Sequence, residues 1–81
     1  MKVRVQFFSQ LKELAGTAEL NVDLPAGATV ADLLKNLYQR APALRKHDSS
    51  ILVGAGLEFV NRDHALKPDE EIAIMPPVQG G

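Results

Sequence analysis

Hydrophobic periodicity constrains the fold of this chain more than any other feature. Residues 2–8 and 18–24 alternate apolar and polar side chains, a pattern typical of strands with one buried face. The inward side chains of these strands are Val3, Val5, Phe7, Leu20, Val22 and Leu24. Residues 9–15 between them suit a short helix, with Ser9 as the N-cap and Gly16 as the C′ stop. We therefore expect the two strands to pair antiparallel across this short helix.

The clearest helix begins after Thr29. Thr29 is a favourable N-cap, and Asp32 three residues later gives a weaker form of the capping box. The apolar residues that follow form one stripe at helical spacing: Val30, Leu33, Leu34, Leu37 and Ala41. Pro42 disfavours helical geometry in the residue before it, so the helix should end there. We interpret residues 43–50 as a polar connection with one irregular turn around Leu44.

The C-terminal half predicts three further strand segments. Residues 51–53 begin a strand, Gly54 and Gly56 mark a bend, a bulge or a hairpin turn, and residues 57–60 form a second short strand. Residues 71–75 form the last strand. The inward residues of this half are Leu66, Ile72 and Ile74. A right-handed crossover through the helix would place the last strand beside the first. The sequence thus predicts an α+β fold, a β-grasp, in which one main helix packs on one face of a mixed sheet.

Composition excludes several classes of function. The chain of 81 residues has a formal net charge of −1 and no basic run, which argues against a nucleic-acid partner. It contains no cysteine, so disulfides, thiolate catalysis and cysteine metal sites are excluded. The most apolar stretch, residues 51–57, is far too short to span a membrane, and no secretory segment is evident. We expect a cytoplasmic protein without a metal site or membrane partner, with a domain at residues 1–75 and an extended tail at residues 76–81.

The tail is the most unusual segment of the sequence. Pro76 and Pro77 each fix φ, so the backbone should leave the domain in one direction. Gly80 and Gly81 have no side chain and can follow a path too narrow for other residues. From Pro77 to Gly81 the tail can reach about 15 Å, enough to carry a terminal carboxylate into a pocket of another protein. The alternative is that Gly-Gly is a frayed end or a cloning scar. If the protein handles sulfur, the Gly81 carboxylate must carry it, because the chain has no thiol.

An apolar patch should lie beside this tail. Phe8 and Met75 fall on the sheet face without the helix, each at the C-terminal end of its strand. Phe59 is a third candidate for the same face. An apolar patch on a polar face usually marks a partner interface. The alternative is that Phe8 packs beneath the helix of residues 9–15.

Residues 7–16, 63–66, 70–73 and 76–81 resemble the N-terminal and C-terminal blocks of a known family. The first reads Phe-Phe-Ser-Gln-Leu-Lys-Glu-Leu-Ala-Gly, and the last reads Pro-Pro-Val-Gln-Gly-Gly. Together they resemble the small subunit of molybdopterin synthase, the MoaD-type sulfur carrier of the ubiquitin-like β-grasp family. The resemblance covers nearly the whole chain in the expected order.

The resemblance implies a function and its partners. A separate adenylating enzyme would use Mg-ATP to activate the Gly81 carboxylate, and a sulfur donor would convert it to a thiocarboxylate. The tail would enter the large subunit of the synthase, which supplies the catalytic site, and the sulfur would pass to cyclic pyranopterin monophosphate. The implied tail residues are Pro76, Pro77, Val78, Gln79 and Gly80, and the implied interface residues are Phe8, Phe59 and Met75. The carrier would hold no permanent cofactor, because ATP is used by the activating enzyme in trans, and it would assemble with the large subunit as a heterotetramer.

Two other functions remain open within this resemblance. The chain could carry sulfur for another pathway, such as thiamine thiazole or an amino acid, or it could be a ubiquitin-like protein modifier. The sequence also departs from the family at Lys12, where arginine is frequent, at residues 55–57, where Val-Asn-Gly is frequent, and at Asp69, where glycine is usual. None of these departures touches the tail.

Overall fold

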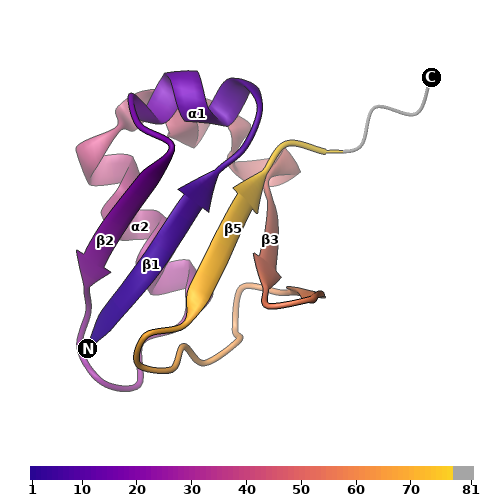
Figure 1. Cartoon of the computed structure of the whole chain (residues 1–81). Helices are drawn as coiled ribbons and strands as arrows, with labels where there is room; N and C mark the ends of the chain where they lie inside the picture. Colours follow the sequence, from indigo (N-terminus) through magenta and orange to yellow (C-terminus); the bar gives the residue numbers. More distant parts are fainter. Residues whose placement is uncertain (78–81) are drawn as a thin grey trace.

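The computed structural model describes residues 1–77, which form a mixed sheet, two α-helices and one 3₁₀-helix (Figure 1). In chain order the elements are β1 (Lys2–Phe7), α1 (Gln10–Ala15), β2 (Glu19–Asp23), α2 (Val30–Arg40), η1 (Pro42–Ser50), β3 (Leu52–Ala55), β4 (Glu58–Val60) and β5 (Glu71–Met75).

The sheet has the strand order β2-β1-β5-β3-β4. β1 pairs antiparallel with β2 and parallel with β5, while β3 pairs antiparallel with both β5 and β4. In Figure 1, α2 crosses behind the sheet and α1 covers the end at which β1 stops. The predicted β-grasp architecture, with the last strand beside the first, is therefore confirmed. One face of the sheet is covered by α2, and we call the other the open face.

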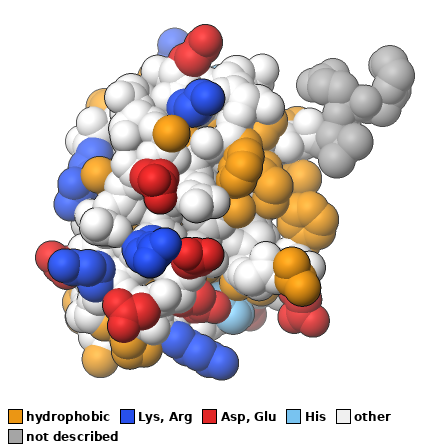
Figure 2. Space-filling model, in the orientation of Figure 1, with side chains coloured by type: hydrophobic (Ala, Val, Ile, Leu, Met, Phe, Trp, Pro, Cys, Tyr) orange, Lys and Arg blue, Asp and Glu red, His pale blue; other side chains and the backbone are white. Residues whose placement is uncertain are grey.

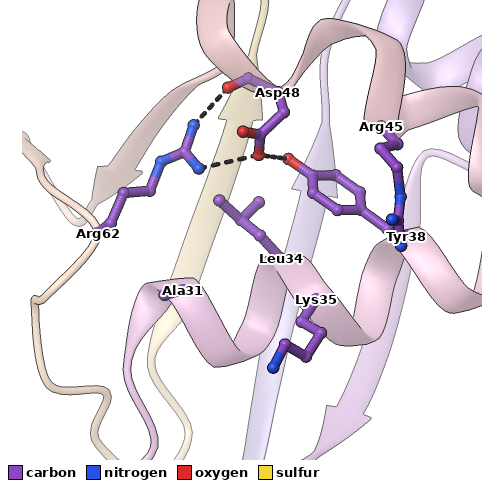
Figure 3. Close-up of a pocket in the computed structure, with 7 residues that line it drawn as sticks. All are labelled: Ala31, Leu34, Lys35, Tyr38, Arg45, Asp48 and Arg62. Atoms are coloured by element: carbon purple, nitrogen blue, oxygen red, sulfur yellow. Dashed lines mark hydrogen bonds and ion pairs between the residues drawn. The ribbon is translucent and has the colours of Figure 1, made fainter.

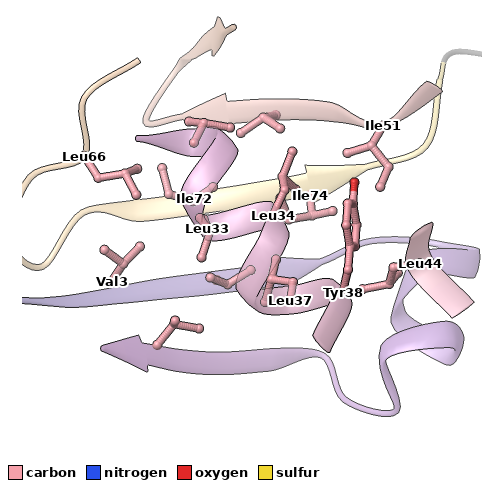
Figure 4. Close-up of a cluster of buried hydrophobic side chains, with 14 of the residues drawn as sticks. Val3, Leu33, Leu34, Leu37, Tyr38, Leu44, Ile51, Leu66, Ile72 and Ile74 are labelled. Carbon is pink, nitrogen blue, oxygen red and sulfur yellow. The ribbon is translucent and has the colours of Figure 1, made fainter. Parts of the chain in front are cut away.

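The hydrophobic core lies between α2 and the sheet (Figure 4). Its buried residues include every inward position predicted for β1 and β5 and the main stripe of α2: Val3, Val5, Phe7, Val30, Leu33, Leu34, Leu37, Ile72 and Ile74. Leu66 is also buried, as predicted, although it lies outside any strand. Leu20 and Ala41 are only partly buried against this core. Within residues 1–77 no charged residue is buried, so the side chains of the interior pack mainly through apolar contact.

The ends of α2 follow the predicted signals. The Thr29 backbone N–H donates to Asp32 Oδ2 at 2.9 Å, and Thr29 Oγ1 accepts from the Asp32 N–H at 3.4 Å. These contacts complete the capping box, and the backbone hydrogen bond from Thr29 is the main reason that the pKa of Asp32 is lowered. Ala41 leaves helical geometry, with φ −135° and ψ 82°, before Pro42, which ends the helix.

The structure corrects the prediction for the segment after α2. Residues 43–50 are not a polar connection with one irregular turn, because Pro42–Ser50 form a continuous 3₁₀-helix of 9 residues. Pro42 occupies its first turn, where a missing N–H costs nothing, and Leu44 is buried in the core. Burial of Leu44 therefore helps to hold this segment against the rest of the domain.

The β3–β4 connection resolves the alternatives at Gly54 and Gly56. Gly56 has φ 64° and forms a two-residue hairpin turn with Leu57, so a hairpin turn is the correct alternative. Gly54 lies within β3, opposite Phe59. The prediction of a strand over residues 57–60 is one residue too long, because Leu57 belongs to the turn.

The N-terminus of α1 also differs from the prediction. Ser9 precedes α1 with φ 53° and ψ −136°, and its side chain makes no capping hydrogen bond. The Leu11 N–H instead donates to the Phe8 carbonyl at 3.1 Å, which closes a turn around Ser9. The predicted stop at Gly16 is confirmed: it has φ 77°, and its N–H donates to the carbonyls of Lys12 and Glu13.

Candidate functional site

The root of the predicted tail lies at the end of β5. Met75 is the last residue of this strand, and half-buried Pro76 and Pro77 then lead the chain away from the sheet (Figure 1). The tail residues Val78, Gln79 and Gly80 and the predicted reactive carboxylate of Gly81 lie outside the described residues. The site described here is therefore the surface around the tail root.

Strand pairing brings Phe8 and Met75 together. In the parallel β1–β5 pair, Phe7 lies opposite Ile74, and the Phe8 N–H donates to the Ile74 carbonyl at 3.1 Å. Phe7 and Ile74 are buried beneath α2, so the next residue of each strand points to the open face. Phe8 remains 43% exposed, which contradicts the alternative of a phenylalanine buried under α1.

Phe59 reaches the same face through a row of paired strands. Gly54 of β3 lies opposite Phe59 of β4 on one side and opposite Ala73 of β5 on the other. Residues directly opposite in antiparallel strands point to one face. Ala73 directly precedes buried Ile74, so its side chain points to the opposite, open face of the sheet. The whole row therefore lies on the open face, where Phe59 is 68% exposed.

These side chains form one apolar surface, which we call the tail-root patch. It comprises Phe8, Leu57, Phe59, Ala73 and Met75. Figure 2 shows hydrophobic side chains gathered on the side of the open face from which the chain leaves the sheet. Sequence reasoning missed Leu57, which is fully exposed, because it assigned this residue to a strand rather than to the turn.

Away from the tail-root patch, the open face carries an ion pair. Arg4 and Glu71 lie opposite one another in the β1–β5 pair, and their side chains form an ion pair at 2.7 Å. Glu70 is also engaged: its carboxylate accepts from the Lys67 N–H at 2.9 Å and lies 3.2 Å from His64 Nε2. The acidic turn around Glu70 is therefore organised by contacts within the chain.

A second cluster of polar side chains lies at α2, on the far side of the sheet (Figure 3). The Tyr38 hydroxyl donates to the Asp48 carboxylate. Arg62 Nη1 donates to Asp48 Oδ1 at 3.0 Å, and Arg62 Nη2 donates to the Asp48 carbonyl. The Arg45 guanidinium lies 5.8 Å from the centre of the Tyr38 ring. We call Tyr38, Asp48 and Arg62 the α2–η1 clasp, because they join α2, η1 and the segment after β4.

The clasp shifts the pKa values of two of its members. The hydrogen bond from Tyr38, and then that from Arg62, lowers the pKa of Asp48. Burial, and then the hydrogen bond to Asp48, raises the pKa of Tyr38 well above its usual range. Both shifts favour the ionised form of the Asp48 carboxylate and the neutral form of the Tyr38 phenol. Each member of the clasp hydrogen-bonds to another member, which indicates a structural role.

The described residues hold neither a metal centre nor a membrane segment. Across residues 1–77, no three His, Asp or Glu side chains come together as metal ligands. No helix in that part of the chain is long and apolar enough to cross a bilayer.

Comparison with known proteins identifies the family. Residues 5–81 match the model of the ThiS family. The chain is 35% identical to the molybdopterin synthase sulfur carrier subunit of Escherichia coli, over 98% of this chain and 99% of that protein. It is 34% identical to the subunit of the same name from Chlamydomonas reinhardtii, with both chains fully covered.

Solved structures agree on the fold. The putative molybdopterin converting factor subunit 1 of Pyrococcus furiosus superimposes with a TM-score of 0.88 at 28% identity, covering 96% of this chain and 99% of that one. The modifier SAMP1 of Haloferax volcanii superimposes with a TM-score of 0.87 at 31% identity, and both chains are fully covered. The chain therefore belongs to the ThiS/MoaD family of ubiquitin-like sulfur carriers.

Proposed function

We propose that this protein is the sulfur-carrier subunit of molybdopterin synthase. Its Gly81 carboxylate is adenylated, converted to a thiocarboxylate, and then delivers sulfur to cyclic pyranopterin monophosphate bound by the large subunit. The carrier contributes the reactive end, and the large subunit contributes the catalytic site. ATP is consumed by a separate activating enzyme.

The position of the tail-root patch is the observation that carries this proposal. The patch includes Met75, the last residue of β5, directly before Pro76 and Pro77, so a partner that covers it also lies next to the residues that follow. An exposed apolar surface of this kind favours a protein partner over a small molecule. The full-length relatives named as molybdopterin synthase sulfur carriers support the choice of partner. The solved complex of subunits 1 and 2 of the Helicobacter pylori molybdopterin-converting factor includes a chain of this fold.

The chemistry explains why the carrier needs a free terminal carboxylate. A carboxylate is a poor electrophile, because its negative charge is shared by both oxygens. Attack of the Gly81 carboxylate on ATP releases pyrophosphate and gives an acyl-adenylate with a good leaving group. A sulfur nucleophile then displaces AMP and leaves a thiocarboxylate. Because the chain contains no cysteine, this sulfur is the only one that the carrier can present as a nucleophile.

Deletion of Gly81 tests the proposal. The deletion should abolish formation of the thiocarboxylate and sulfur transfer in a reconstituted synthase. It should leave the unfolding midpoint unchanged, since Gly81 lies beyond β5. Mass spectrometry of the carrier, after incubation with the activating enzyme, Mg-ATP and a sulfur donor, reads out the replacement of oxygen by sulfur.

An Asn21→Ala variant, changed at an exposed position of β2, is the matched control and should react like the wild type. Sulfur transfer by the Gly81 deletion at the wild-type rate would refute the proposal.

A ubiquitin-like modifier is the second candidate, favoured by the full-length similarity to SAMP1. In that case the Gly81 carboxylate would form isopeptide bonds with lysines of other proteins. Mass spectrometry of lysates from the native host, with the carrier tagged at its N-terminus, would reveal such adducts. Thiocarboxylate without adducts would favour the sulfur carrier alone.

A further inference from the structure

Gly54 lies next to the side chains of the tail-root patch. It lies in β3 on the open face, between Ala73 of β5 and Phe59 of β4. Its φ is outside the positive range, so the backbone conformation does not require glycine. The absence of a side chain at Gly54 matters because it leaves space on the open face of β3.

Met75 lies over Gly54. A Cβ atom placed on Gly54 would lie 3.2 Å from Met75 Cε, 3.7 Å from Ala73 Cβ and 3.7 Å from the Glu58 carbonyl oxygen. The first of these distances is too short for comfortable van der Waals contact. The methionine side chain therefore crosses from β5 over β3 and occupies space that any larger residue at position 54 would claim.

A hollow of about 180 Å³ lies beside this methionine. Its lining residues are Gly54, Gly56, Leu57, Glu58, Phe59, Ala73 and Met75. An apolar cavity of about 150 Å³ is large enough for a benzene ring, so this hollow suits one aromatic or branched aliphatic side chain. The wall formed by Met75 is flexible and can adjust to the shape of such a side chain.

We propose that this hollow is a socket that receives one large apolar side chain of the synthase large subunit, and that Gly54 keeps the socket open. The inference rests on the proposed function and identifies the partner group that the patch binds. The side chains that line the hollow are mostly apolar, and Glu58 is the one charged residue among them, so an apolar occupant is favoured over an anionic one. A second copy of this chain is a poor occupant, because self-association through the patch would cover the tail root of both copies.

Replacing Gly54 with alanine distinguishes an effect on partner binding from an effect on folding. The added methyl group pushes the end of Met75 into the hollow, so the large subunit should bind about tenfold more weakly. The unfolding midpoint should stay the same or rise, because alanine reduces the entropy of the unfolded chain and Met75 can move. Calorimetry with the isolated large subunit measures the first effect, and thermal unfolding measures the second.

A double-substitution cycle adds a sharper test. In a Met75→Ala background the new methyl group has nothing to displace, so Gly54→Ala should weaken binding by much less than in the wild type. Asn21→Ala, on β2 at the other edge of the sheet, serves as the control and should bind as the wild type does.

The outcomes distinguish the socket from the proposed function. If the wild type binds the large subunit and Gly54→Ala binds equally well, the socket is wrong and the function stands. If the two substitutions act additively, Gly54 does not act through the space that it shares with Met75, and the socket is again wrong. If the wild type does not bind the large subunit at all, both fail. If the free carrier self-associates and Gly54→Ala abolishes this self-association, the hollow binds a second copy of the chain, and the proposal is overturned.

Discussion

Ser9 adopts a backbone conformation that glycine would hold with less strain. Its φ of 53° with ψ −136° lies where a side chain crowds the backbone, and such residues cost about 1–3 kcal/mol. The serine hydroxyl makes no capping bond that would offset this cost. The conformation follows from neighbouring contacts, because the Phe8 N–H is held by β5 while the Phe8 carbonyl accepts from Leu11.

Ser9→Gly should therefore stabilise the fold by about 0.5–1.5 kcal/mol, after allowing for the greater entropy of glycine in the unfolded chain. Urea unfolding measures the change. Ser49→Gly is the control: Ser49 lies in η1 with an ordinary negative φ, so the same substitution should destabilise the fold. If Ser9→Gly lost as much stability as Ser49→Gly, the inference that the Ser9 backbone is strained would be wrong.

The sequence predicts some single-residue features well because their causes are local. The capping box of α2 depends on Thr29 and Asp32, which are three residues apart, and the spacing alone indicated it. Asp69 has φ 62°, a left-handed conformation that aspartate tolerates better than most residues. The conformation of Ser9 was not predictable, since it depends on a hydrogen bond to a strand more than 60 residues away in the sequence.

Among the secondary-structure elements, η1 depends on the α2–η1 clasp. The clasp hydrogen bonds tie η1 to α2 through Tyr38 and to the segment after β4 through Arg62. Tyr38→Phe keeps the ring and removes the hydroxyl donor. Its free energy of unfolding should fall by about 1–2 kcal/mol at neutral pH, because the bond to an ionised carboxylate is lost.

The pH dependence of this contribution follows from the two pKa shifts. The lowered pKa of Asp48 gives stability that is present above its unfolded value and lost as the pH falls through the folded value. The raised pKa of Tyr38 gives stability that is present below its unfolded value of about 10 and lost as the pH rises toward the folded value. The wild type should therefore lose stability above pH 10, and Tyr38→Phe should lack this alkaline loss.

Tyr38 can be titrated directly, because it is the only tyrosine and the chain has no tryptophan. Phenolate absorbance should rise at higher pH in the folded protein than in denaturant. Asp48→Asn should bring the folded midpoint down part of the way, since burial, the larger cause, remains. Equal midpoints in the folded and denatured chain would show that Tyr38 is not held by the clasp.

The sequence predicted α2 but not η1, and the reason lies in the range of the interactions. An apolar stripe over three turns indicates a helix from neighbouring residues alone. A 3₁₀-helix of 9 residues has little intrinsic stability, and here it depends on the burial of Leu44 and on contacts from α2 and Arg62. Those contacts exist only once the chain has folded. The tail-root patch was partly predictable, because alternation places Phe8 and Met75 on one face, whereas the hollow above Gly54 depends on the pairing of three strands.

At the scale of the whole molecule, the open face is divided between two kinds of surface. The tail-root patch occupies the side from which the chain leaves the sheet (Figure 2). The Arg4–Glu71 ion pair joins β1 and β5 elsewhere on that face. Exposed ion pairs contribute little to stability, and the charges of Arg4 and Glu71 already have partners within the chain. The free energy of binding a partner should therefore come mainly from the apolar side, next to the tail.

Phe8→Ala tests this division on the intact protein. The side chain is 43% exposed, so its removal should lower the free energy of unfolding by no more than about 1.5 kcal/mol. Binding to the large subunit should weaken by about 2 kcal/mol, roughly 30-fold, because a partner would bury the rest of the ring. Calorimetry and urea unfolding measure the two effects separately.

Lys35→Ala, at an exposed position of α2 across the sheet, is the control and should change neither binding nor stability. Unchanged binding of Phe8→Ala would place the partner elsewhere, and the tail would then have to reach it without guidance from the patch at its root.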